Sequence, residues 1–142
     1  MGDVAKRRRD ELELIKDVAS RCKTAVVTGP AAARWLGLST YRWVQTVDLA
    51  LPGNSRTWGD TDRRRAYHGG LLRETEYLTH NGVRTATAIR AMFDTFRYHG
   101  RMDALVQIES ARFQHDHLTT DYLLAKTETL TRARGIKPFR EL

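Results

Sequence analysis

The spacing of apolar positions predicts a helix over residues 3–22. Apolar side chains recur there every three or four residues, which is the period of one helix face, and Asp3 precedes them in a capping position. Residues 6–10 are polar all round, so we expect the first turns of this helix to project from the body of the protein. The side chains of the expected apolar face are Leu12, Ile15, Val18, Ala19 and Cys22.

Helical periodicity returns in the second half of the chain. The clearest helix begins at Thr85 or Thr87, either of which can cap it, and ends at Gly100. Its apolar residues stand at positions i, i+3, i+4 and i+7, and they are Ile89, Met92, Phe93 and Phe96. We expect a further helix over residues 103–113 and a last one over residues 119–134.

Short extended segments lie between the first helix and these later ones. Residues 24–28 are rich in β-branched side chains and predict a strand, and residues 44–51 predict a second strand that is half buried. Between them, Pro30 suits the first turn of a short helix over residues 30–36, which Gly37 is placed to end. The order predicted for this part of the chain is strand, helix, strand.

A β-hairpin is the strongest local signal in the middle of the chain. Asn81-Gly82 stands between the extended runs 76–80 and 83–85, and both turn residues tolerate the positive φ that a tight hairpin requires. Residues 64–68 are a further strand candidate. The sequence therefore predicts an α+β fold, with a small, mainly antiparallel sheet, an N-terminal helix and three C-terminal helices.

Composition indicates a packed, soluble protein. The chain has 142 residues, of which 41% are hydrophobic, and this excludes a disordered protein. We divide it into a basic N-terminal helix over residues 1–22 and a core domain over residues 23–142. The single cysteine, Cys22, cannot form an internal disulfide. No apolar run approaches the ~18 residues of a membrane span, and the basic N-terminus lacks the apolar stretch of a signal peptide, so we expect a cytoplasmic protein without a membrane partner.

Positive charge is concentrated in two segments. The chain has 24 lysines and arginines against 17 acidic residues, a net charge of +7. Residues 1–42 and residues 56–101 each hold nine basic and five acidic side chains, whereas residues 43–55 carry a charge of −1 and residues 102–142 are balanced. Most of the cations are arginines, whose planar guanidinium donates two parallel hydrogen bonds to phosphate. This pattern favours a basic face that contacts nucleic acid, and a solvated surface is the alternative interpretation.

Few residues suggest catalysis or metal binding. His115-Asp116-His117 falls between two predicted helices, and Asp60 and Asp62 lack the further oxygen ligands of a calcium loop. The phosphate-loop, serine-elbow and His-Glu-x-x-His motifs are absent, and no strand candidate carries the acid-x-lysine pair of a magnesium-dependent nuclease. We therefore expect no metal, no cofactor and no enzymatic activity.

Arginines near aromatic residues form the best candidate site. Residues 63–65 start a predicted strand beside a loop that contains Trp58, an arrangement suited to backbone contact combined with stacking. Residues 6–9 are a candidate second arm. The expected nucleic-acid-binding residues are Arg7, Arg8, Arg9, Arg56, Arg63, Arg64 and Arg65. The alternative is that these charges only solvate an edge strand and the N-terminus.

Three stretches of the chain, in order, resemble a known family. Residues 25–38 resemble a strand followed by an Ala-Ala helix that ends in Gly-Leu, and residues 47–52 and 65–68 resemble two short strands. Residues 81–94 resemble a hairpin that leads into a helix with an Arg-x-x-x-Asp pattern. Together, over roughly residues 24–140, they resemble the actinobacterial relatives of the AbiEi antitoxins of type IV toxin–antitoxin systems.

The resemblance covers the core domain of that family and departs from it at two places. Thr28-Gly29 stands where family members often have Ser-His, and His68-Gly69 stands where they often have His-Arg. Many relatives also begin with a winged-helix domain and end with a nuclease domain, and we expect neither here.

The resemblance implies a non-catalytic, antitoxin-like regulator, of the kind found in transcription regulation and phage defence. With the charge pattern, the leading hypothesis is that it contacts nucleic acid, DNA in preference, through an arginine-rich face. The alternative is a protein-interaction or scaffold module that binds a partner or a second copy of itself, with Trp35, Trp43 and Trp58 as candidate anchors. A degenerate nuclease is the third hypothesis.

Overall fold

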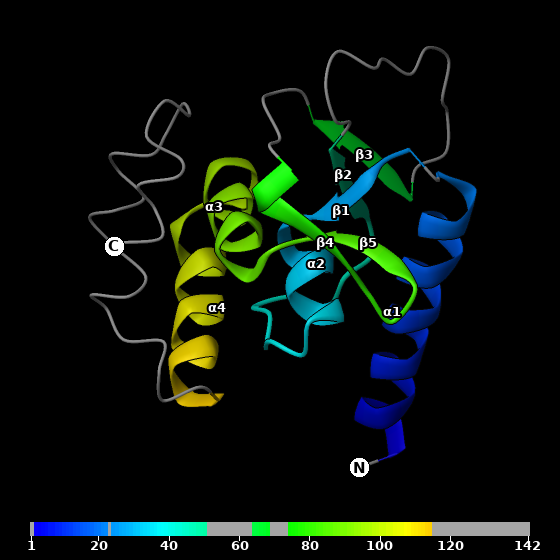
Figure 1. The fold of residues 1–142 in the computed structure, drawn as a ribbon. Helices are drawn as coiled ribbons and strands as arrows, with labels where there is room; N and C mark the ends of the chain where they lie inside the picture. The colour runs from blue at the N-terminus through cyan, green and yellow to red at the C-terminus, as the bar shows by residue number, and fades with distance from the viewer. Residues whose placement is uncertain (1, 23, 51–63, 69–73, 115–142) are drawn as a thin grey trace.

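The computed structural model describes residues 2–22, 24–50, 64–68 and 74–114 (Figure 1). The predicted α+β class is confirmed. In chain order, the elements are helix α1 (Gly2–Arg21), strand β1 (Val26–Thr28), helix α2 (Gly29–Trp35), strands β2 (Val47–Ala50) and β3 (Arg65–His68), a 3₁₀ turn (Glu74–Glu76), strands β4 (Tyr77–His80) and β5 (Val83–Ala86), and helices α3 (Ala88–His99) and α4 (Arg101–Gln114). The last predicted helix, residues 119–134, lies outside the described residues.

Strand β1 lies at the centre of a five-stranded sheet with the order β3-β2-β1-β5-β4. It pairs antiparallel with β2 and parallel with β5, while β4 and β5 are antiparallel and β2 and β3 are parallel. The sheet is therefore mixed rather than mainly antiparallel. Parallel pairs arise through long crossover connections, and such connections leave no turn signal in the sequence.

Strand β2 is shorter and more deeply buried than its sequence predicts. All four of its side chains are buried, because β2 lies between β1 and β3 in the sheet and both α1 and α2 pack against it. Asp48 is among them, with only 2% of its surface exposed. Residues 44–46, which were predicted to extend this strand, belong instead to the connection from α2.

The hairpin and helix α3 form as predicted. Asn81 and Gly82 have φ values of 49° and 79°, which is the paired positive φ of a two-residue hairpin turn. Thr87 is the N-cap of α3, and its side-chain oxygen accepts a hydrogen bond from the backbone N–H of Arg90. Gly100 follows the helix with a φ of 99°, a conformation that glycine adopts without steric cost.

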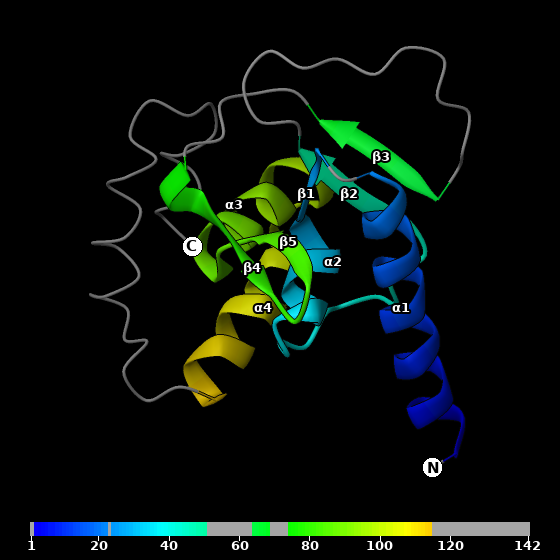
Figure 2. The same cartoon turned by 45° about the vertical axis from the view of Figure 1, so that its right-hand side comes forward.

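Two apolar clusters make up the core. One joins Ile15 and Val18 of α1 to the strands, and the other joins α2, α3 and α4 around Met92 and Phe93. Figures 1 and 2 show α1 at one side of the molecule and α3 with α4 at the other, with the sheet and α2 between them. The first turns of α1 extend past the sheet as predicted, and residues 4–10 are exposed.

No helix among the described residues combines the length and the apolar character that a bilayer crossing requires.

Candidate nucleic-acid interface

Arg7, Arg8 and Arg9 belong to the N-terminal half of α1. The first turns of this helix extend past the sheet (Figure 2). All three side chains are exposed, and within the described part of the chain none of them forms an ion pair with a carboxylate. Successive helix residues point about 100° apart, so the three guanidinium groups spread around the helix axis. This half of α1 is a cationic arm whose side chains are exposed to solvent.

Arg64, a second predicted contact residue, is brought to α1 from the far end of the sheet. It precedes β3, and its Nη1 lies 3.0 Å from Oδ2 of Asp17, whose other oxygen lies 3.2 Å from Nε of Arg21. The hydrogen bonds from Arg21 and Arg64, in that order, hold the pKa of Asp17 below its ordinary value. Arg64 therefore shares a carboxylate with Arg21 and offers less net charge than the sequence suggests.

Of the other predicted contact arginines, the structure describes only the backbone position of Arg65. Arg65 belongs to β3, in register with Val47 of β2. Arg56, Arg63 and Trp58 lie outside the described residues. The expected cluster of arginines with interleaved aromatic residues therefore stays a prediction.

Lys16, a cation that sequence reasoning missed, lines up with Arg9 on α1. Seven residues separate the two, so their side chains leave the helix within about 20° of one another, two turns apart. Asp17 points about 100° away from Lys16, toward Arg64. One side of α1 therefore carries Asp17, which pairs with Arg21 and Arg64. Arg9 and Lys16 lie on a different side of the helix.

On the side of Lys16, a groove of about 430 Å³ separates α1 from the β4–β5 hairpin. Arg84 of β5 lines the groove opposite Lys16, in register with Thr79 of β4. The guanidinium of Arg84 lies 5.6 Å from the ring centre of Tyr77, and this cation–π contact holds it beside the groove. The lining residues are Lys16, Ala19, Ser20, Ala25, Thr79, Asn81, Gly82, Val83 and Arg84.

The described cations fall into two groups. Seven arginines form ion pairs with carboxylates, and they are Arg21, Arg34, Arg42, Arg64, Arg90, Arg97 and Arg112. The cations without such a pair among the described residues are Lys6, Arg7, Arg8, Arg9, Lys16, Arg84 and Arg101. All but Arg101 belong to α1 or to the hairpin beside it, so the charge available to a ligand is concentrated there.

Trp43 connects the cationic arm to the body of the protein. Its ring lies 5.7 Å from the guanidinium of Arg7 and 5.6 Å from that of Arg34. Arg34 pairs at 2.9 Å with Glu11, which is 3% exposed, and the other oxygen of Glu11 accepts a hydrogen bond of 2.5 Å from the amide of Val44. Glu11 therefore ties α1, α2 and the following connection together, a role that its place on a helix face did not reveal.

Trp35 and Trp58 were the other two candidate anchors for a protein partner. Trp35 is half-buried against the core, and its Nε1 donates a hydrogen bond of 2.7 Å to the carbonyl of His80. Trp35 therefore packs against the core and attaches the hairpin to α2. Trp58, the third candidate anchor, lies outside the described residues.

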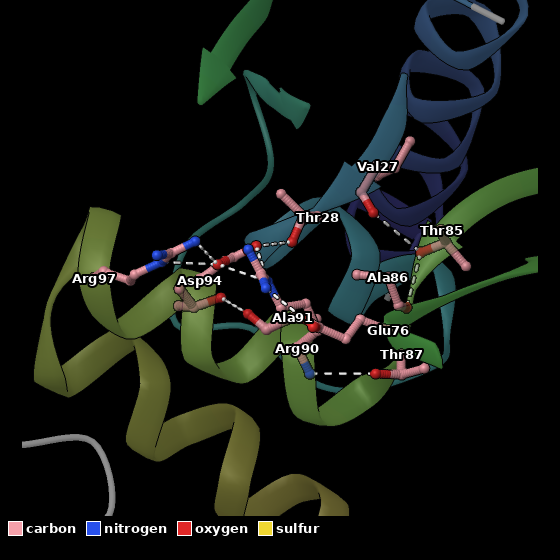
Figure 3. Close-up of polar contacts among 11 residues, drawn as sticks. Val27, Thr28, Glu76, Thr85, Ala86, Thr87, Arg90, Ala91, Asp94 and Arg97 are labelled. Carbon is pink, nitrogen blue, oxygen red and sulfur yellow. Dashed lines mark hydrogen bonds and ion pairs between the residues drawn. The ribbon is translucent and has the colours of Figure 1, made fainter. Parts of the chain in front are cut away.

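A buried polar network holds α3 against the sheet (Figure 3). Asp94 of α3, 1% exposed, accepts a hydrogen bond of 2.5 Å from Oγ1 of Thr28 at the end of β1. Nε of Arg90 lies 3.1 Å from both of its oxygens, and Nε of Arg97 lies 2.9 Å from one. Arg90 also donates to the carboxylate of Glu76, just before β4.

This network is balanced, so it has a structural rather than a ligand-binding character. Burial by itself would lower the pKa of Arg90, but the charges of Asp94 and Glu76 raise it overall. Two carboxylates match the two arginines, and their fixed geometry positions the hairpin and therefore Arg84. The Arg-x-x-x-Asp spacing of Arg90 and Asp94 was the available signal in the sequence.

His99 at the end of α3 pairs with the buried Asp48 of β2. Nε2 of His99 lies 2.5 Å from Oδ2 of Asp48, and the two side chains are 37% and 3% exposed. The hydrogen bond to Asp48 is the main cause that raises the pKa of His99 above its ordinary value of 6.5. Burial lowers this pKa, the charges of Asp48 and Asp103 raise it, and the charge of Arg42 lowers it.

The pair between His99 and Asp48 predicts a contribution to stability that depends on pH. Because the pKa of His99 is raised in the folded state, the contribution is complete below about pH 6.5 and is lost as the pH rises through the folded-state pKa. We expect His99→Gln to lower the free energy of unfolding most at about pH 5.5 and least at about pH 9. Urea unfolding of both proteins at the two pH values measures the gap, and a gap that widens with pH contradicts the prediction.

The remaining candidate groups stay predictions. His115-Asp116-His117, and Asp60 with Asp62, lie outside the described residues. Comparison of this chain with protein families, curated proteins and solved structures finds no match. The resemblance to the AbiEi antitoxins therefore stays an expectation from the sequence.

Proposed function

We propose that this protein is a non-catalytic regulator that binds nucleic acid, DNA in preference, through the cations of α1 and of the adjoining hairpin. The observation that carries the proposal is the grouping of exposed lysines and arginines without a carboxylate partner among the described residues. Elsewhere in the described chain, arginines are mostly paired with acidic side chains. Evenly mixed charges would be enough for solubility, so this local excess supports a polyanionic ligand.

The chemistry of the cations suits phosphate groups more than bases. Arg7, Arg8 and Arg9 spread around a projecting helix, which lets them follow a charged backbone but does not aim them at one base edge. Contacts of this kind fix position and affinity and carry no sequence information by themselves. We therefore expect binding that is strong at low salt and only weakly selective, with an antitoxin-like role supported by the sequence resemblance.

Binding to duplex DNA is expected to weaken steeply as salt is added. Each neutralised phosphate contributes about 0.9 to the slope of log affinity against log salt. Replacing Arg8 and Arg9 by glutamine should reduce that slope by about 2, because two phosphate contacts are lost. Fluorescence anisotropy with a labelled mixed-sequence duplex, measured between about 50 and 200 mM salt, gives the slope.

Arg112→Gln is the matched control, because Arg112 is an exposed arginine of α4 that already pairs with Glu109. It should leave the slope unchanged. Binding that does not depend on salt, or no binding at about 50 mM salt, would contradict the proposal. A protein that fails to bind but is dimeric by light scattering would instead favour the protein-interaction module.

A further inference from the structure

The groove between α1 and the β4–β5 hairpin has the features of a binding site as well as of a charged surface. We propose that it holds one nucleotide of the bound nucleic acid, with the phosphate between Lys16 and Arg84 and the sugar and base over the apolar floor. This inference rests on the proposed function, because it names the subsite at which that ligand would be seated.

The size of the groove fits such a unit. Its volume of about 430 Å³ falls in the range of about 300–1,000 Å³ that is usual for small-molecule sites. The walls come from two elements that the fold holds rigidly, since Val18 of α1 and Val83 of β5 belong to the same core cluster. The groove is therefore preformed, and a ligand would not need to open it.

The two cations face the groove from opposite walls. Lys16 comes from α1 and Arg84 from β5, and neither has an ion-pair partner among the described residues. The contact with Tyr77 restrains Arg84, so less side-chain entropy is lost when it binds phosphate. A phosphate between the two walls would receive hydrogen bonds from both sides and would neutralise both charges.

The remainder of the lining suits the rest of a nucleotide. Ala19, Ala25 and Val83 present small apolar side chains, and Gly82 adds no side chain. The floor is therefore open enough for a flat ring or a sugar. Ser20 donates its hydroxyl hydrogen to the carbonyl of Asp17 at 2.7 Å, which leaves its oxygen free to accept a hydrogen bond from a ligand.

NMR titration with a 5′-phosphorylated trinucleotide tests this subsite, because a probe of this length can occupy the groove without the rest of a duplex. We expect amide shifts at Ser20, Gly82 and Arg84 on titration. Lys16→Ala and Arg84→Ala should each weaken binding about fivefold to tenfold. Ser20→Leu, which narrows the groove without changing the charge, should weaken binding as well.

Arg101→Ala and Arg112→Ala are the matched controls. They remove exposed positive charge from α4, away from the cations of α1 and of the hairpin, and neither residue lines the groove. Both should leave trinucleotide binding within about twofold of the native protein. Inorganic phosphate and a free nucleoside monophosphate, titrated in parallel, distinguish a nucleotide within a strand from a free nucleotide or a bare anion.

The outcomes separate this inference from the proposed function. If a long duplex binds but the trinucleotide does not shift the groove residues, or if Lys16→Ala and Arg84→Ala behave like their controls, the subsite is wrong and the regulator stands. If the trinucleotide binds in the groove while the duplex does not bind, the subsite is supported and the proposed function is wrong. If neither ligand binds, both are overturned.

Discussion

Replacing Asp94 with alanine is expected to lower the free energy of unfolding by about 3–5 kcal/mol, the usual loss when one partner is removed from a buried ionic network. Asp94 is 1% exposed, and its carboxylate is the shared partner of Arg90, Arg97 and Thr28. Without it, Arg90 would keep only Glu76 as a described carboxylate partner, while its own side chain is 3% exposed. The expected loss is large because the buried guanidinium of Arg90 would then be paired with one carboxylate instead of two.

Urea unfolding followed by circular dichroism measures this loss. Asp94→Asn keeps the shape of the side chain and an oxygen that can accept from Thr28, so it should lose less than the alanine variant. Glu109→Ala is the control, because Glu109 belongs to an exposed pair on α4, and its effect should stay within about 0.5 kcal/mol. An Asp94→Ala loss below about 1 kcal/mol would mean that the network contributes no more than an ordinary surface contact.

Gly29→Ala is the substitution with the second largest expected effect, a loss of about 2–4 kcal/mol. Gly29 has a φ of 62°, where an L-residue costs about 1–2 kcal/mol. A Cβ at this position would also lie 2.8 Å from Oδ2 of Asp48, the oxygen that holds His99. The new methyl group must therefore displace a buried carboxylate from its partner.

Gly37→Ala separates the two causes. Gly37 also has a positive φ, of 89°, but a Cβ there would meet no atom within 4 Å, so only the backbone cost applies. Thermal and urea unfolding compare the two variants, and NMR titration of the His99 ring shows whether its raised pKa falls back toward 6.5 in Gly29→Ala. Equal losses in the two variants would contradict the role assigned to Asp48.

Local chemistry explains why parts of this fold could be predicted from sequence. The hairpin at Asn81-Gly82 and the caps of α3 at Thr87 and Gly100 depend on residues within a few positions of one another. The burial of Ile15 and Val18 on α1 was predictable for the same reason, because helix periodicity is a short-range pattern. Leu12, which was assigned to the same face, is instead 37% exposed. Each of these predictions needed no knowledge of the distant chain.

Contacts between distant residues account for what could not be predicted. Asp48 is buried because other strands and helices surround β2. The pattern of polar and apolar residues within β2 does not show these neighbours. Arg64 was predicted as a free cation, but its partner Asp17 lies 47 residues earlier. The groove was missed because Lys16 and Arg84 belong to elements that only the completed sheet brings together.

The position of β1 at the centre of the sheet also governs the order in which the chain can fold during synthesis. Residues 26–28 pair with β2 soon after they are made, but their parallel partner β5 is reached 58 residues later. Thr28 meets Asp94 only after 66 further residues. The hairpin and α3 can form locally as they emerge, whereas one edge of β1 stays open until they arrive. An open strand edge is a template for pairing with another chain, so the interval before β5 emerges is the period in which a nascent chain of this protein is most exposed to misassembly.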